Sequence, residues 1–290
     1  MNLYKLRLSL KSALATPLKG DTIWGHFAWG IANHEGEEAV EKFINDSKSS
    51  EPPLIVSSAF PINTLCKPIP EPQERVEKLT IQSYSAIKKA KKNIFCDASE
   101  YISSIDEKAA TENAFSAVPC MHNTINRMTN TVTEGGLFTS TEFWPKQKEF
   151  NLYIASTYDL ERIKTLALWA FENGYGADSS TGKGNITLSE DPVLVKTLKK
   201  GIKYMALAPF VLQDFSTVKN LRADTFIRSG KIGGYFSQNL IPWKKTIVMY
   251  DEGAVFESDT AITFIGTLLQ NIHSDSRICH SGFAPVIPIE

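Results

Sequence analysis

Apolar and polar residues alternate near the start of the chain, over residues 4–11. A period of two predicts a strand with one buried face and one face in water. After a turn at residues 16–20, Asp21 can cap a helix whose apolar residues recur at helical spacing over residues 23–31. We expect this helix to continue to about Asn45. A strand followed by a helix is therefore the first predicted unit.

A similar unit recurs later in the chain. Residues 149–155 form a β-rich run, and Asp159 can cap a following helix that Gly174 would end. A short β-rich run at residues 54–60 precedes this unit, and residues 185–195 supply strand material after it. The order is then β-α-β followed by β-α-β, which is the ferredoxin-like order.

The periodicity is lost between these two units, at about residues 66–145, and we interpret this segment as an insertion. Residues 201–290 are mostly β, with the clearest strands at residues 204–212 and 246–250. The terminal run to Ile289 contains prolines and is predicted to be an edge strand. We therefore predict an α+β fold with an N-terminal domain over residues 1–200 and a C-terminal domain over residues 201–290.

The composition is that of a globular protein with local rather than general basicity. In 290 residues, 31 Lys and Arg oppose 32 Asp and Glu, which gives a net charge of -1. A protein that coats nucleic acid by bulk electrostatics carries a large positive charge, so any RNA or DNA contact must be local. No apolar run approaches the ~18–20 residues of a membrane helix, and no signal-peptide pattern is present, so we expect no membrane contact and a cytoplasmic location.

The stretch most indicative of function is Gly174–Gly184, which directly follows the second predicted helix and reads GYGADSSTGKG. Glycines let the backbone reach positive φ and approach a ligand closely, and Ser179, Ser180 and Lys183 can donate to anionic oxygens. This pattern favours phosphate binding. A mobile surface turn is the alternative, because clusters of glycine and serine between periodic segments are usually loops.

A nucleotide site is a further alternative for this loop, but the spacing disagrees with it. A Walker A loop needs a glycine, four residues and then Gly-Lys-Ser/Thr, whereas Ala177 stands at the first glycine position and Gly184 at the Ser/Thr position. The loop also follows a helix and not a strand. The dinucleotide fingerprint fails as well, because Ser179 stands where its last glycine belongs.

His26 lies on the first predicted helix between Gly25 and Gly30. Each glycine inside a helix costs roughly 1 kcal/mol relative to alanine, so two of them suggest the close approach of another segment. A functional interpretation makes His26 a general base that deprotonates a ribose hydroxyl. The alternative is a structural histidine that hydrogen-bonds the glycine loop or an interface, which we favour because no partner acid or base is identifiable nearby.

Two other stretches carry donors that suit RNA. Residues 122–130 are rich in amide, hydroxyl and guanidinium groups and lead to a predicted turn at Gly135 and Gly136. A polar cap over a helical insertion is the alternative there. A second glycine-rich run, Gly230–Gly234, is predicted to be the tip of a hairpin between residues 225–228 and 235–237. Cations gather around it, as in a phosphate-lined groove: Lys219, Arg222, Arg228 and Lys231.

The cysteines and histidines do not predict a metal centre. Cys120 and His122, and likewise Cys279 and His280, are too close in sequence for the spacing of structural zinc sites. We expect no metal and no cofactor.

Several of these runs together resemble the RAMP superfamily of CRISPR proteins, and most closely the subunits that cap the crRNA 5′ end in type III-A (Csm) effector complexes. The runs that carry the resemblance are Gly20–Trp29, Pro52–Pro61, Asn126–Thr129 with Glu134–Phe138, Gly230–Tyr235 and Gly282–Ile289. They are spread over the whole chain and follow the order of the family.

The resemblance implies two ferredoxin-like (RRM-like) RAMP modules, with a glycine-rich loop and a thumb-like insertion. It also implies a noncatalytic role in antiviral defence: holding the repeat-derived 5′ tag of the crRNA, contacting the large polymerase-like subunit and seating the first backbone RAMP subunit. RNA contacts are then expected at Lys19, Arg127, Thr129, Gly135, Gly136, Ser179, Ser180, Gly182, Lys183, Gly184, Arg222, Lys231, Gly233 and Gly234. Asp178 departs from the family pattern and would repel a phosphate at that end of the loop.

Two other classes of function stay open at this stage. One is a metal-independent endoribonuclease that processes crRNA with His26, as some relatives in the superfamily do. The other is a nucleotide-binding protein that uses the Gly174–Gly184 loop.

Overall fold

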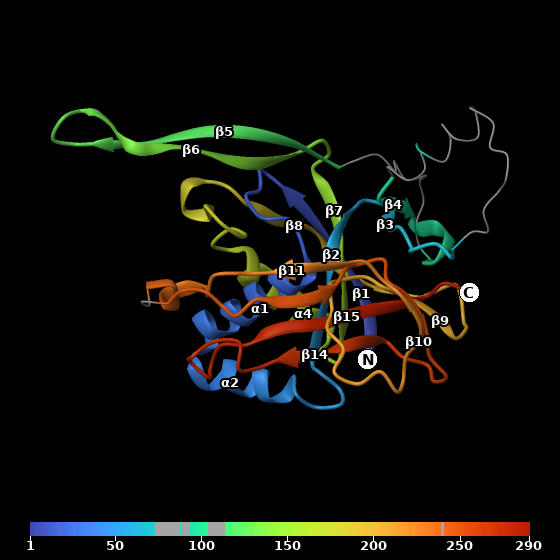
Figure 1. The fold of residues 1–290 in the computed structure, drawn as a ribbon. Coiled ribbons are helices and arrows are strands. Elements are labelled where there is room, and N and C mark those ends of the chain that lie inside the picture. The colour runs from blue at the N-terminus through green and yellow to red at the C-terminus, as the bar shows by residue number, and fades with distance from the viewer. Residues whose placement is uncertain (73–87, 89–92, 104–113, 239–240) are drawn as a thin grey trace.

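A computed structural model describes residues 1–72, 88, 93–103, 114–238 and 241–290 of the chain. The described part is α+β, as predicted, and a long hairpin projects from it (Figure 1). Among the described residues, no helix combines the length and the apolar character needed to cross a membrane. Three α-helices lie wholly within the described residues: α1 (Gly20–Glu35), α2 (Glu37–Asp46) and α4 (Leu160–Phe171).

The first sheet contains the strand predicted from alternation and the three predicted from β-rich runs. Its members are β1 (Asn2–Leu10), β2 (Leu54–Pro61), β7 (Glu149–Ser156) and β8 (Ile186–Val195). They lie in the order β2-β7-β1-β8, and each neighbouring pair is antiparallel. β1 and β7 are therefore central. The chain passes through α1 and α2 between β1 and β2, and through α4 between β7 and β8.

The main core lies between this sheet and the helices. Leu8 of β1, Phe27 of α1 and Leu166 of α4 are fully buried in it. Burying a side chain of this size contributes roughly 1.5–3 kcal/mol relative to leaving it in water. The Asp159 side chain accepts a hydrogen bond from the Arg162 backbone N–H, so the predicted cap of α4 is confirmed.

The prediction of one helix reaching Asn45 is wrong, because Gly36 interrupts it. Gly36 has a φ of 91°, and α2 begins at the next residue. Glycine adopts such a φ at little cost. The predicted cap is wrong too, since Lys19 occupies the N-cap position and Asp21 lies buried in the first turn. An ion pair with Arg228 draws the Asp21 carboxylate away from the helix terminus.

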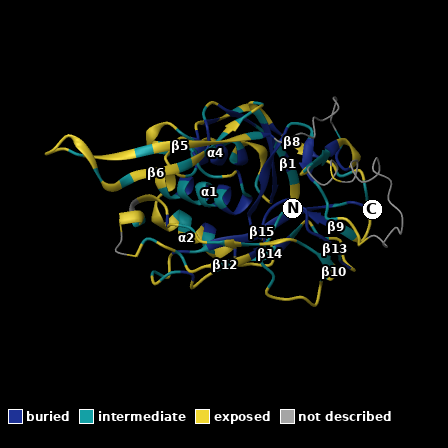
Figure 2. Ribbon diagram, turned by 45° about the horizontal axis from the view of Figure 1, so that its top comes forward, coloured by how far each residue is buried: buried dark blue, intermediate teal, exposed yellow. Residues whose placement is uncertain are grey.

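The long described part of the predicted insertion is a β-hairpin, not a helical segment. It consists of β5 (Phe115–Asn126) and β6 (Thr131–Pro145). Earlier in the chain β3 (Thr64–Cys66) pairs with β4 (Phe95–Asp97), and the short 3₁₀ helix η1 (Ala98–Glu100) follows. Figure 2 shows that the sheets are largely buried, whereas this hairpin is exposed along most of its length.

The tight turn of the hairpin lies at residues 127–130 and not at Gly135 and Gly136, so that turn prediction is wrong. The Asn130 backbone N–H donates to the Asn126 carbonyl at 2.8 Å, and Asn130 has a φ of 54°. Asparagine tolerates this left-handed conformation better than most residues. Gly135 and Gly136 belong to β6 and lie next to a shift in its register with β5. Gly135 has a φ of 71°, which glycine adopts readily at such an irregularity.

The second sheet is built from residues 201–290. Its strands are β9 (Lys203–Ala206), β10 (Lys219–Arg222), β13 (Val255–Glu257), β14 (Phe264–Leu269) and β15 (His280–Pro288), in the order β10-β13-β9-β15-β14. β11 (Thr225–Arg228) and β12 (Ile247–Tyr250) form a separate antiparallel pair. No α-helix occurs in the described residues 201–238 and 241–290, so the expected second ferredoxin-like module is not confirmed. The predicted domain boundary falls between β8 and β9 and stays a prediction.

Two strand predictions in this half are wrong. β11 pairs with β12, so Gly230–Gly234 is not the tip of a tight hairpin, and the residues after it form the 3₁₀ helix η3 (Gly234–Gln238). β15 was expected at an edge but lies between β9 and β14. Pro285 is tolerated because β15 changes its partner there, pairing with β14 up to Pro285 and with β9 from Val286.

Candidate nucleic-acid interface

Helix α1 lies between the two glycine-rich runs. We call Gly174–Gly184 the first glycine loop and Gly230–Gly234 the second glycine loop. His26 contacts the first loop and Trp29 contacts the second. Residues three apart share one face of a helix, so α1 holds both loops from neighbouring positions.

His26 is a hydrogen-bond acceptor for the first glycine loop. The Gly176 backbone N–H donates to His26 Nε2 at 3.2 Å, and the ring also hydrogen-bonds the backbone of Ala170 at the end of α4. Burial lowers the pKa of His26 to about 4, so the imidazole is neutral at physiological pH. This is the hydrogen bond that the structural interpretation predicted. The lone pair that a general base would use is already engaged.

The backbone of the first glycine loop is fixed at its end and open in its middle. Gly184 has a φ of 67°, is buried, and donates its N–H to the Ala13 carbonyl at 2.8 Å. A Cβ at this position would overlap the Tyr175 carbonyl oxygen. Ser180 and Gly182 are exposed and Ser179 is half-buried, within or next to the 3₁₀ helix η2 (Ser179–Thr181). The exposed middle of the loop is therefore the part that can meet a ligand.

Lys183 joins this loop to the projecting hairpin. Its ammonium group lies 3.0 Å from Glu142 of β6 and 3.1 Å from Asp178. The hydrogen bond to Glu142 is the main reason that the pKa of Lys183 is raised. A phosphate at Lys183 would have to displace these carboxylates, so the ammonium is occupied in the free chain.

The tip of the hairpin lies far from the first glycine loop. Arg127 and Thr129 belong to the exposed turn between β5 and β6, and the adjoining Met128 is 95% exposed. At about 3.3 Å per residue, the strand from Glu142 to this turn spans on the order of 30 Å. Gly135 and Gly136 lie on the same outer part of β6. These four predicted contacts thus form a group apart from the first glycine loop (Figure 1).

The second glycine loop packs on the indole of α1. A Cβ on Gly233 would lie 2.5 Å from Trp29 Nε1, and one on Gly234 would lie 2.5 Å from the far edge of the same ring. Only glycine therefore allows this approach. Lys231 is exposed, and its ammonium group lies over the ring of Trp243 at 4.8 Å from the centroid.

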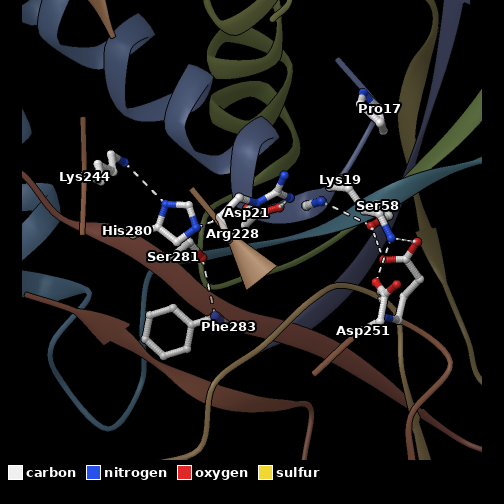
Figure 3. A network of polar contacts seen from close by, with 12 residues as sticks. Pro17, Lys19, Asp21, Ser58, Arg228, Lys244, Asp251, His280, Ser281 and Phe283 are labelled. Atoms are coloured by element: carbon white, nitrogen blue, oxygen red, sulfur yellow. Dashed lines mark hydrogen bonds and ion pairs between the residues drawn. The ribbon is translucent and has the colours of Figure 1, made fainter. Parts of the chain in front are cut away.

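Two predicted contact residues are engaged elsewhere. Lys19 forms ion pairs of 2.6 Å with both Asp251 and Glu252, as Figure 3 shows for Lys19 and Asp251. Burial opposes its charge, but these carboxylates outweigh it and raise the pKa of Lys19. Arg222 lies at the end of β10 and forms an ion pair of 3.2 Å with Glu71. The structure does not bring Arg222 together with either glycine loop.

Comparisons with known proteins support one fold. No protein-family model matches the sequence, and no curated protein matches it. The crystal structure of a Csm1–Csm4 cassette in complex with pppApA contains a chain with 14% identity and a TM-score of 0.59, which covers 100% of this chain and 98% of that chain. The cassette in complex with AMPPNP gives 13% identity and a TM-score of 0.61 over the same shares.

A third similar structure is the Csm3–Csm4 subcomplex of the type III-A CRISPR-Cas interference complex. Its matching chain is 12% identical and has a TM-score of 0.54, and the match covers 100% of each chain. Csm4 is the subunit that these complexes have in common. The chain has the Csm4 fold. The resemblance predicted from the sequence is therefore confirmed at the level of the fold.

Within the Csm4 fold of this chain, sequence reasoning missed a buried polar network below α1 (Figure 3). The Asp21 side chain, 0% exposed, lies 2.7 Å from Arg228 of β11 and 3.1 Å from His280 of β15. The Lys244 ammonium follows at 3.3 Å from the other ring nitrogen of His280. Burial lowers the pKa of both His280 and Lys244. The only sequence signal was a carboxylate at the edge of the apolar stripe of α1.

This network connects helix α1 to the second sheet and to the β11–β12 pair. Burial opposes the charge of Asp21, but hydrogen bonding and attraction from His280, and then from Arg228, lower its pKa. Its carboxylate therefore stays ionised and ties the start of α1 to β11 and β15. The network fixes α1, and through α1 it fixes the position of both glycine loops.

Proposed function

We propose that this chain is the crRNA-capping subunit of a type III-A CRISPR effector complex. In this role it holds the repeat-derived 5′ tag of the crRNA and bridges the large polymerase-like subunit to the backbone RAMP subunits. It has no chemistry of its own and acts in the cytoplasm. The first sheet with α1 and α4 is its first ferredoxin-like module, and the β5–β6 hairpin is its thumb.

The observation that carries the proposal is the full-length Csm4 fold. The similar chains come from complexes with Csm1 and with Csm3, and the likeness extends over 100% of this chain. A match over the whole length includes the projecting hairpin and both sheets, which a similarity confined to one common module would not. The partners proposed here are the counterparts of those two subunits.

The arrangement around α1 supports an RNA backbone as the ligand. The exposed middle of the first glycine loop and the exposed Lys231 of the second lie on loops that the same helix holds. Backbone N–H groups, hydroxyls and ammonium groups bind phosphate and sugar without reading bases. Such contacts position a strand and suit a near-neutral protein with a local basic surface.

The absence of catalysis is proposed on the state of His26. Its Nε2 accepts from Gly176, and its pKa of about 4 leaves it a weak base. An efficient general base has a pKa near the working pH. No observation favours the ribonuclease alternative over the capping role.

Copurification tests the proposal. A tagged copy is expressed with genes for a large subunit and backbone subunits of a type III-A complex from its own genome and with a repeat array, and we expect these subunits and a small RNA with a repeat-derived 5′ end to copurify. A tagged copy expressed without the array is the control for RNA. If neither partner subunits nor small RNA are recovered, the proposal is rejected.

Labelled repeat RNA tests the noncatalytic part separately. The purified chain is incubated with this RNA in the presence of a chelator, and we expect the RNA to stay intact. A 2′,3′-cyclic phosphate product that disappears in His26→Ala would contradict the noncatalytic role and support the alternative.

A further inference from the structure

A cavity of about 410 Å³ opens beside the second glycine loop. Helices α1 and α2 line one side of it, and residues 232–236 and 270–279 line the other. Its volume lies at the small end of the ~300–1,000 Å³ range of ligand sites in proteins. The RNA contacts expected from the sequence do not use this cavity, apart from Gly233 on its border.

The walls of the cavity are aromatic and aliphatic. Trp29 and Phe236 form one wall, with ring centroids 5.9 Å apart, and Ile232 and Ile278 are buried beside them. The guanidinium of Arg277 covers the Phe236 ring at 4.7 Å from the centroid. Phe236 thus contacts planar groups from both α1 and the 270–279 segment.

The polar lining of the cavity includes charges of both signs, on Glu37, Glu41, Lys48, Lys244 and Arg277. Asn33 of α1, Gln270 and Ser276 supply amide and hydroxyl groups that both donate and accept. Arg277 is neutralised by Asp275 at 2.8 Å and by Glu37 at 3.2 Å. Apolar planar walls with hydrogen-bonding groups at the rim are the chemistry that recognises a nucleobase.

We propose that this cavity receives one unstacked base of the bound RNA and reads its edge. The inference rests on the proposed function, because it assumes that an RNA strand lies along α1. The glycine loops contact backbone and therefore cannot discriminate sequence. A subunit that recognises a defined tag needs a second kind of site, and the cavity supplies it through Asn33, Gln270 and Ser276.

The position of the cavity connects it to the RNA path. Trp29 lines the cavity and packs against Gly233 and Gly234, and Gly233 lines the cavity as well. A strand whose phosphates lie at the second glycine loop has a neighbouring base within reach of this cavity, because the loop itself borders the cavity. Lys231 stacked on Trp243 extends the same surface outward.

The experiment uses the purified full-length chain and the tag RNA recovered from the complex, resynthesised with one abasic nucleotide placed at each position in turn. Binding is compared for the wild type, for Ala32→Phe, which fills the cavity from α1, and for Gln270→Ala. Glu38→Phe is the matched control, since it adds the same ring on an exposed position of α2 that does not line the cavity. Circular dichroism confirms that each variant is folded.

We expect one abasic position to weaken binding about tenfold, the range in which a stacked base contributes. Ala32→Phe should weaken binding of the intact RNA by a similar factor and should not further weaken binding of the abasic RNA. Gln270→Ala should reduce discrimination among the four bases at that position, while Glu38→Phe should change nothing.

The outcomes separate the inference from the proposed function. A wild-type chain that binds the RNA with equal loss at every abasic position overturns the inference alone. The inference is also overturned if Ala32→Phe weakens binding of the abasic RNA by the same factor as binding of the intact RNA, because the two changes then act independently. If the effector complex purified with the Ala32→Phe variant keeps its RNA but loses a protein subunit, the cavity holds a side chain of that subunit and the inference is overturned. A wild-type chain that binds no RNA overturns the proposed function as well.

Discussion

Removal of the Asp21 carboxylate should destabilise the whole chain, because it is the shared anion of the network below α1. Its side chain is fully buried, 2.7 Å from Arg228 and 3.1 Å from His280. Asp21→Ala leaves a guanidinium and an imidazole without this anion in a poorly hydrated place. Breaking a buried ion pair in this way costs about 3–5 kcal/mol. The Arg228 side chain keeps 20% of its surface in water, so we expect the lower end, about 3 kcal/mol.

Urea unfolding at pH 7, followed by circular dichroism, measures this free energy. Asp46→Ala is the matched control, because Asp46 is an exposed aspartate on α2 and should change stability by less than about 0.5 kcal/mol. The reasoning is refuted if Asp21→Ala loses no more than this control. In a double-mutant cycle, the variant with both Asp21→Ala and Arg228→Ala should lose less unfolding free energy than the sum of the losses of the two single variants. The second substitution removes the charge that the first leaves unpaired.

The same carboxylate predicts a pH dependence. The pKa of Asp21 is lowered from its usual value of 3.8 in the folded chain. Its stabilising contribution is therefore complete above about pH 4 and is lost as the pH falls through the folded value. The difference in stability between the wild type and Asp21→Asn should be constant from about pH 5 to 7 and should shrink below about pH 4.

Other predictions concern the two loops. Because the pKa of His26 is about 4 in the folded chain, stability should fall as the pH drops from about 6.5 to 4, and the dependence of the unfolding temperature on pH should be shallower in His26→Gln. Gly184→Ala should destabilise by about 1–3 kcal/mol from its φ of 67° alone, and the overlap of the new Cβ with the Tyr175 carbonyl oxygen adds to this cost. Gly25→Ala, with no atom within 4 Å of the added Cβ, should stabilise by up to about 1 kcal/mol. Urea unfolding in which both variants change stability in the same direction would contradict this. Lys183→Met and Arg127→Met should each weaken crRNA retention for all sequences and lower the salt dependence of binding by about one unit of slope, and a changed sequence preference in filter binding would count against phosphate contacts. Calorimetric titration with ATP should give no heat, because Gly184 already donates its N–H to Ala13.

The sequence predicted the first sheet because its strands are either alternately more and less buried, as in β1, or largely apolar, as in β2 and β7. Alternation over residues 4–11 reflects a strand with one face more buried than the other. The Asp159 cap could be predicted because its partner, the Arg162 backbone N–H, is only three residues away. The hairpin was missed for the opposite reason. Both faces of β5 and β6 are mostly in water, so burial imposes no period of two on their side chains.

Contacts between distant parts of the chain could not be predicted from local patterns. Asp21 looked like a cap because a carboxylate before an apolar stripe usually is one. Its actual partners, Arg228 and His280, are separated from it by 207 and 259 positions. The same holds for Trp29 against Gly233, where the glycines were noticed but the indole that requires them was not.

The projecting hairpin also bears on how long the proposed capping subunit survives before it is assembled. An isolated pair of strands is only marginally stable in water, so β5 and β6 should open often beyond the contact between Glu142 and Lys183. The exposed Arg127 at the turn is then a site for a trypsin-like protease. In an assembled complex the same arm would be covered by neighbouring subunits and RNA. Proteolysis would thus remove orphan copies and spare assembled ones, which would keep the subunit in proportion to its partners.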